Sequence, residues 1–95
     1  METTELFPPG RMMMTRGIAA LIADNPAAAA AVKDSLRRHL AGDCGDMDHD
    51  DVLANASALL TGERIFSSYL TAIGKLWVIT EADRSATTLL LPEEY

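Results

Sequence analysis

The sequence is poor in cysteine, in aromatic residues and in long hydrophobic runs. Its single thiol, Cys44, cannot close an internal disulfide, which excludes a disulfide scaffold, and no secretory signal segment opens the chain. We therefore expect a protein of the reducing cytoplasm. The longest apolar stretch, residues 26–32, is mostly alanine and is much too short to span a bilayer, so no membrane role is expected.

Basic residues are also scarce. The chain has 8 lysines and arginines against 14 aspartates and glutamates, which gives a formal net charge of -6. This charge repels a phosphate backbone unless the basic residues gather on one face, and in the sequence they are scattered. We therefore expect no direct nucleic-acid binding, and a basic protein is the easier partner to accommodate.

The usual signatures of enzymes and cofactor sites are missing too. There is no catalytic triad pattern, no glycine-rich phosphate loop and no set of four zinc ligands, since Cys44 has only His39, His49 and nearby aspartates to join it. A thiol and imidazole pair built on Cys44 lacks a recognisable orienting group. We predict a protein that is not an enzyme, with no catalytic residue, no cofactor and no metal.

The sequence does contain enough apolar residues to form the core of one folded domain. Of 95 residues, 48% are hydrophobic and 23% are charged, as in ordinary globular proteins. We predict a flexible N-terminal arm over residues 1–9, of which Leu6 and Phe7 could tuck against the domain, and a single α+β domain over residues 10–95.

Three helices are predicted ahead of the last third of the chain. A short helix follows Thr15 and ends at Asn25, because Pro26 disfavours a helical residue before it. A second helix starts at Pro26, is rich in alanine and ends near Gly42. A third begins after an aspartate-rich loop, with Asp48 or Asp50 as its cap, and stops at Gly62; its predicted apolar face comprises Val52, Leu53, Ala56, Leu59 and Leu60.

The last third predicts an antiparallel three-stranded meander over residues 64–71, 75–81 and 86–91, and residues 11–14 predict a fourth short strand. Residues 76–80 are apolar or β-branched on both faces, which is typical of a central strand with other elements packed over it. We expect Trp77 in this core. The predicted architecture is an α+β fold with the sheet packed against two to three helices.

Acidic residues supply the first candidate site. The loop before the third helix begins like a calcium-binding EF-hand loop, but Asp51 stands where glycine is needed and Ser57 where glutamate should close the cage. Capping and solvation explain these aspartates more simply than a metal does. As surface groups that could bind a partner we take Asp43, Asp46, Asp48, Asp50 and Asp51, and in the turn before the last strand Glu81, Asp83 and Arg84.

Two segments carry a resemblance to a known family. They are residues 36–46 (LRRHLAGDCGD) and 77–95 (WVITEADRSATTLLLPEEY). In both, the chain resembles a family of small bacterial proteins found on chromosomes, plasmids, phages and integrative elements, some labelled as restriction-enzyme subunits. At 95 residues the chain is too small for a methyltransferase. Cys44 replaces a tryptophan that is common in the family. The resemblance implies a mobile-element context and no particular reaction.

Three functions then compete. The first is a small acidic protein-binding module, such as an inhibitor of a host defence nuclease (anti-CRISPR or anti-restriction), whose carboxylates imitate phosphate charge. The alternative is a small ribonuclease toxin of the RelE type. The third is a homodimer built on an exposed sheet edge or on the methionine strand, with no catalytic role. The ribonuclease would use His39, Tyr69, Glu81 and Arg84.

Overall fold

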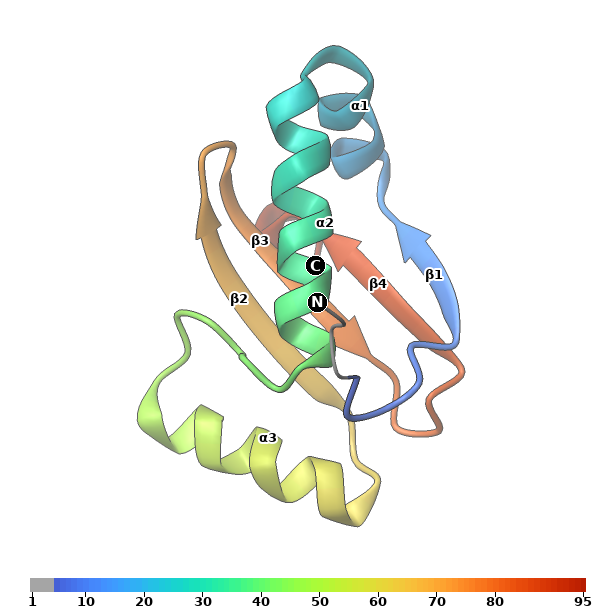
Figure 1. The fold of residues 1–95 in the computed structure, drawn as a ribbon, viewed down its shortest axis with the longest axis vertical. Coiled ribbons are helices and arrows are strands. Elements are labelled where there is room, and N and C mark those ends of the chain that lie inside the picture. Colours follow the sequence, from blue (N-terminus) through green and yellow to red (C-terminus); the bar gives the residue numbers. More distant parts are fainter. Residues whose placement is uncertain (1–4) are drawn as a thin grey trace.

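The computed structural model describes residues 5–95 and confirms the predicted α+β fold (Figure 1). Within these residues no helix has both the length and the apolar composition needed to cross a bilayer. The elements, in chain order, are β1 (Arg11–Met14), α1 (Arg16–Asp24), α2 (Pro26–Leu40), α3 (His49–Thr61), β2 (Ile65–Thr71), β3 (Gly74–Thr80), β4 (Ala86–Leu90) and the short 3-10 helix η1 (Pro92–Glu94).

The four strands form one sheet in the order β1-β4-β3-β2. The predicted meander is confirmed, because β3 pairs antiparallel with β2 on one side and with β4 on the other. The predicted fourth strand is also present, and it pairs with β4 in parallel. Its ends are anchored by two backbone hydrogen bonds, from Arg11 N–H to the Ser85 carbonyl (2.9 Å) and from Thr15 N–H to the Leu89 carbonyl (3.1 Å).

Local chemistry accounts for the helix boundaries. The Asn25 side chain accepts a hydrogen bond from Ala27 N–H (2.9 Å), and Pro26 takes the first helical position, where no N–H is needed. At the end of α3, Gly62 adopts a left-handed conformation with φ of 78°. The start of α1 is capped from the far end of the chain, because Glu94 accepts hydrogen bonds from Gly17 N–H (2.9 Å) and from the Thr15 hydroxyl.

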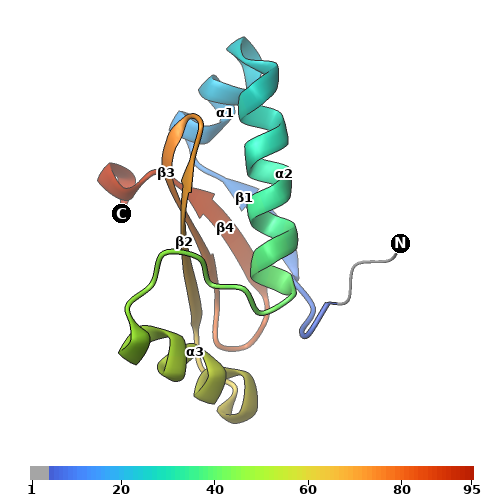
Figure 2. The same ribbon diagram turned by 60° about the vertical axis from the view of Figure 1, so that its left-hand side comes forward.

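One face of the sheet is covered by α1 and α2, as Figure 2 shows with the sheet nearly edge-on. The main core lies between these layers, where burying apolar side chains supplies most of the driving force for folding. It consists of Ile18 and Val32 from the helices and Tyr69, Leu76, Val78 and Leu89 from the strands. A second cluster lies near α3 and contains Phe7, Leu40, Ala58 and Ile65.

The prediction that Trp77 lies in the core is wrong. Side chains alternate along a strand, and since Leu76 and Val78 point toward the helices, Trp77 points to the opposite face. There it is half-buried between two aromatic rings, with ring centroids 4.9 Å away at Phe66 and 5.4 Å away at Tyr95. The cover on this side includes the C-terminal turn, which is visible in Figure 2 on the side away from α2.

The predicted apolar face of α3 is wrong in part, because Leu59 packs against the second cluster but Leu53 and Leu60 do not. Only Ala58 of this helix is fully buried, whereas the Leu53 side chain is 55% exposed and Leu60 is 90% exposed. The reason lies in Asn55, whose amide donates to the Phe66 carbonyl and accepts from Phe66 N–H (3.2 Å). These two bonds turn the Asn55 side of the helix toward β2 and leave Leu53 and Leu60 outside. Asp48 occupies the N-cap position, but its side chain makes no capping bond.

Of the predicted N-terminal arm, residues 1–4 lie outside the described part of the chain, and residues 5–9 pack against the domain. Leu6 N–H donates to the Leu40 carbonyl (2.8 Å). The Phe7 ring is buried and meets the His39 ring edge-on at 5.4 Å between centroids. The Phe7 ring also contacts Arg84, whose guanidinium carbon lies 5.5 Å from the ring centroid.

Two leucines test the assignment of the core. Leu76 is fully buried, while Leu70, only one register pair away on β2, is 72% exposed. We expect Leu76→Ala to lower the free energy of unfolding by about 3 kcal/mol, because it leaves a cavity under the helices. Leu70→Ala should change it by about 0.5 kcal/mol or less. Urea unfolding measures both, and equal losses would contradict the assignment.

Candidate functional site

A continuous line of buried polar side chains crosses the helix-facing side of the sheet. The His39 imidazole, on α2, lies 2.6 Å from the Ser67 hydroxyl through Nδ1 and 2.8 Å from the Thr80 hydroxyl through Nε2. The Thr80 hydroxyl lies 2.7 Å from that of Thr87, which in turn donates to the Pro9 carbonyl (2.7 Å). The line thus connects α2 with β2, β3, β4 and the N-terminal segment.

The Pro9 carbonyl sets the direction of every hydrogen bond in this line. A carbonyl only accepts, so the Thr87 proton points to Pro9 and the Thr87 oxygen must accept from Thr80. The Thr80 proton is then used, and its oxygen accepts from the Nε2–H of His39. A neutral imidazole has no second proton, so Nδ1 accepts from the Ser67 hydroxyl.

The resulting Ser67 to His39 hydrogen bond has the polarity of a nucleophile and its base, but its electrostatics do not suit catalysis. Burial lowers the pKa of His39 to about 4, so the imidazole resists protonation at neutral pH. A base that takes the Ser67 proton would become a buried imidazolium whose Nε2 faces a neutral hydroxyl instead of a carboxylate. The arrangement therefore suits holding α2 against β2 and β3 better than activating Ser67 as a nucleophile.

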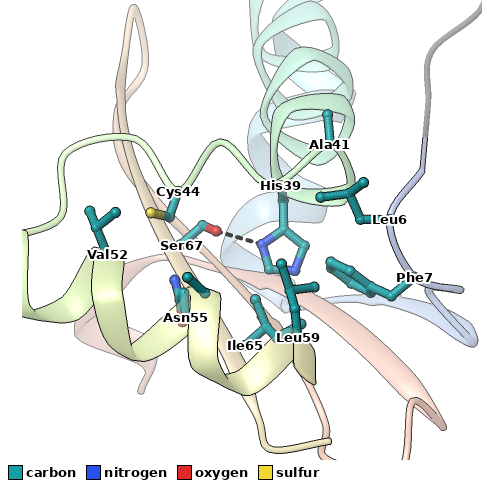
Figure 3. Close-up of a pocket in the computed structure, with 12 residues that line it drawn as sticks. Leu6, Phe7, His39, Ala41, Cys44, Val52, Asn55, Leu59, Ile65 and Ser67 are labelled. Atoms are coloured by element: carbon teal, nitrogen blue, oxygen red, sulfur yellow. Dashed lines mark hydrogen bonds between the residues drawn. The ribbon is translucent and has the colours of Figure 1, made fainter. Parts of the chain in front are cut away.

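A small cavity of about 160 Å³ lies beside this line (Figure 3). Ser67, His39 and Asn55 contribute polar groups to its wall, and the buried thiol of Cys44 also lines it. Most of the other lining side chains are apolar and come from the N-terminal segment, α3 and β2: Leu6, Phe7, Val52, Leu59 and Ile65. Nδ1 of His39 is held by Ser67, so the imidazole is not free to pair with the Cys44 thiol.

Among the aspartates of the acidic loop, Asp43 differs from the others because it is bound within the loop itself. Asp43 is bound to Arg38, with 2.7 Å between the carboxylate and Nε, and it also accepts from Gly45 N–H (3.0 Å). The hydrogen bond from Arg38 holds the pKa of Asp43 below its usual value. The Asp43 backbone carbonyl accepts a further bond from the Tyr69 hydroxyl. Asp43 is thus part of the loop's own structure.

The other four aspartates are exposed and lie at the start of α3 and in the loop before it: Asp46, Asp48, Asp50 and Asp51. Across residues 5–95, none of the ion pairs involves these four carboxylates. Asp50 and Asp51 occupy the first turn, where negative charge complements the helix dipole. Among residues 5–95, no group of three or more acidic, histidine or cysteine side chains is placed so that it could hold a metal ion.

The second predicted group, in the turn before β4, lies at the other end of α3. The Arg84 guanidinium donates to the carbonyls of Glu63 (2.7 Å) and Ala58 (3.1 Å), so it closes the C-terminal end of this helix. The Glu81 carboxylate lies 3.9 Å from Nε of Arg64. Asp83 accepts from Ser85 N–H (3.0 Å), and hydrogen bonding to the Ser85 side chain first, and to this N–H second, holds the pKa of Asp83 below its usual value. A helix of 13 residues separates the two groups by about 20 Å.

The residues proposed for a ribonuclease are not gathered on an open surface. Tyr69 and His39 are 0% and 1% exposed and are bound within the core, while Arg84 is bound to backbone carbonyls at the end of α3. Comparisons of the chain with protein-family models, with curated proteins and with solved structures found no match. The family resemblance of residues 36–46 and 77–95 therefore stays a prediction.

Reasoning from sequence missed the polar line itself. The sequence offers His39 as a thiol partner, a metal ligand or a ribonuclease group, and it gives no functional role to Ser67, Thr80 or Thr87. One signal was present: His39 lies within the apolar stripe of α2, three residues after Leu36 and next to Leu40, and an imidazole in such a stripe needs buried hydrogen-bond partners.

The lowered pKa of His39 predicts acid sensitivity. The unfolded chain binds a proton at His39 near pH 6.5, whereas the folded chain does so only near pH 4. The contribution of the neutral imidazole to the free energy of unfolding is therefore fully present above pH 6.5 and is lost as the pH falls toward 4. The loss should reach about 3 kcal/mol. Urea unfolding between pH 7.5 and 4.5 measures it.

Two variants separate this histidine from other titrating groups. His39→Gln should be less stable at pH 7.5 and should lose most of the slope between pH 7 and 5. His49→Asn changes an exposed imidazole and should keep the slope of the parent protein. If His39→Gln retains the full slope, the acid sensitivity has another origin and the account of His39 is wrong.

Proposed function

We propose that this chain is a non-enzymatic protein-binding module of the cytoplasm, and that its acidic surface binds a basic surface of another protein. The acidic surface is defined by Asp46, Asp48, Asp50 and Asp51. The observation that carries the proposal is that these four carboxylates are exposed at one end of α3 and form no ion pair with any described residue. Their field is therefore available to a partner.

Apolar side chains next to the acidic surface support the same proposal. Leu53 follows close behind on the chain and is 55% exposed, and Leu60, two helical turns further along on the same side of α3, is 90% exposed. Exposed apolar groups beside charged ones resemble the composition of protein interfaces, in which an apolar centre has a polar rim. The internal bonds of Asn55 keep this side of α3 facing outward.

The partner that we propose is a nucleic-acid-binding protein, and the biological role is inhibition of a host defence nuclease. A surface that grips phosphates is basic, and four neighbouring carboxylates present a comparable density of negative charge. The resemblance to mobile-element proteins is what suggests a defence nuclease, of the CRISPR or restriction type. The net charge of -6 favours this inhibitor over a ribonuclease, which must itself attract RNA.

Charge neutralisation tests the proposal. Replacing the four aspartates of the acidic surface with asparagine should weaken binding to a co-purifying basic protein at least about tenfold and reduce its salt dependence, because several screened ion pairs are lost. Binding is measured by titration at two salt concentrations. Circular dichroism checks that α3 still forms.

A matched control removes four negative charges elsewhere on the chain and should leave binding nearly unchanged. It converts four other exposed carboxylates to amides: Glu5, Asp24, Glu63 and Glu93. If the two variants bind alike, net charge and not the acidic surface determines affinity. If the acidic-surface variant keeps the partner and the affinity of the parent chain, this binding mode is excluded.

A further inference from the structure

The two outer edges of the sheet differ. The edge of β2 is largely covered by the chain itself: Asn55 binds the backbone N–H and carbonyl of Phe66, and the loop next to Cys44 binds those of Ser68. Gly45 permits this second contact, since its φ is 72° and a Cβ there would lie 2.1 Å from the Ser68 carbonyl. Such protection is how natural proteins prevent unwanted strand pairing.

The edge of β1 has no comparable cover. Arg11 and Thr15 point their N–H groups to β4, and because the direction alternates along a strand, Met12 and Met14 point theirs outward. No described residue donates to or accepts from the backbone of these two methionines on the outer side. Figure 1 shows β1 as the outermost strand, with no other described element beyond it. The edge therefore offers two N–H and two carbonyl groups.

An apolar groove of about 340 Å³ runs beside this edge, between β1 and α2. Met12 and Met14 form its strand side, and both methionines are 43% to 50% exposed. Met13 and Leu89 also line it from the sheet, and the helices contribute Ile22, Ala29, Val32, Lys33 and Leu36. An added strand would place alternate side chains over this groove, as in known cases of strand addition, where backbone bonds give affinity and pockets give specificity.

Charge indicates which strand would fit. Arg11, Arg16 and Lys33 flank the edge and its groove, and none forms an ion pair with a described residue, although the whole chain carries -6. A second copy paired antiparallel through β1 would bring Arg11 of one copy near Arg16 of the other. Four-residue strands also bury less area than a stable dimer needs. Both points favour a foreign acidic segment.

We propose that the β1 edge binds an extended segment of another protein by strand addition, and that this segment has apolar residues at alternate positions and carboxylates near its ends. Outward N–H and carbonyl groups of Met12 and Met14 bind its backbone, the groove takes its apolar side chains, and Arg11 and Lys33 pair with its carboxylates. This binding surface is separate from the acidic surface on α3, so either proposal can fail without the other.

The probe for this proposal is an acetylated and amidated hexapeptide, Glu-Val-Thr-Val-Thr-Glu, added to the whole chain. In an extended strand its two valines and last glutamate share the groove side, where Lys33 lies, and its first glutamate lies on the opposite side with Arg11. Backbone amide NMR should show shift changes and slowed hydrogen exchange centred on Met12 and Met14. The same peptide with lysine at both ends should bind about fivefold more weakly, since two surface ion pairs are replaced by repulsions. Shift changes that avoid β1, or equal affinity for the two peptides, would overturn the proposal.

Two variants complete the test. Met12→Pro removes an outward N–H that β4 does not use, and proline is tolerated at such an edge position, so the fold should persist while affinity falls about tenfold. Lys33→Glu should weaken binding without touching the backbone, and Lys75→Glu, which alters an unpaired cation away from β1, should not. If light scattering shows a dimer that Met12→Pro dissociates, a second copy occupies the edge and the proposal is wrong.

Discussion

The hydrogen-bonded line from Ser67 through His39, Thr80 and Thr87 to Pro9 is the constraint on which the rest of the structure depends. It joins α2 to three strands and to the N-terminal segment, whose Phe7 packs on the same imidazole. No buried side-chain polar atom in the described residues lacks a partner. A line that is fully satisfied specifies one arrangement of these elements, whereas losing one member leaves buried polar groups unpaired.

This internal role of the polar residues bears on function. The histidine and hydroxyl groups that could suggest catalysis are buried and used within the fold, and Arg84 and Asp43 are likewise bound by the chain itself. Two separate surfaces of opposite charge carry groups that form no ion pair with a described residue. One is the acidic surface at the start of α3, and the other is the β1 edge with its flanking cations; these are the two surfaces that we propose as binding sites for partners.

Local signals in the sequence were sufficient for most element boundaries. Proline after Asn25 and glycine at position 62 determine helix ends, and β-branched runs mark the meander, because these effects act within a few residues. The position of β1 beside β4 depends on residues more than 70 apart in the chain, which no local pattern reports.

The errors have a common physical cause. Trp77 was assigned to the core and Leu53 to a buried helix face because both are apolar, but a strand or helix has two sides and hydrophobicity alone does not say which is covered. Leu76 and Val78 took the covered side of β3, and the bonds of Asn55 to Phe66 set the rotation of α3. Both outcomes depend on long-range contacts.

The protonation state of one imidazole tests this account most directly. Long-range 15N NMR spectra of the His39 ring at pH 7 report which nitrogen carries the proton. The account predicts a neutral ring with the proton on Nε2, because the Pro9 carbonyl orients every hydroxyl between itself and the imidazole. A proton on Nδ1 alone, or a charged ring at pH 7, would contradict it.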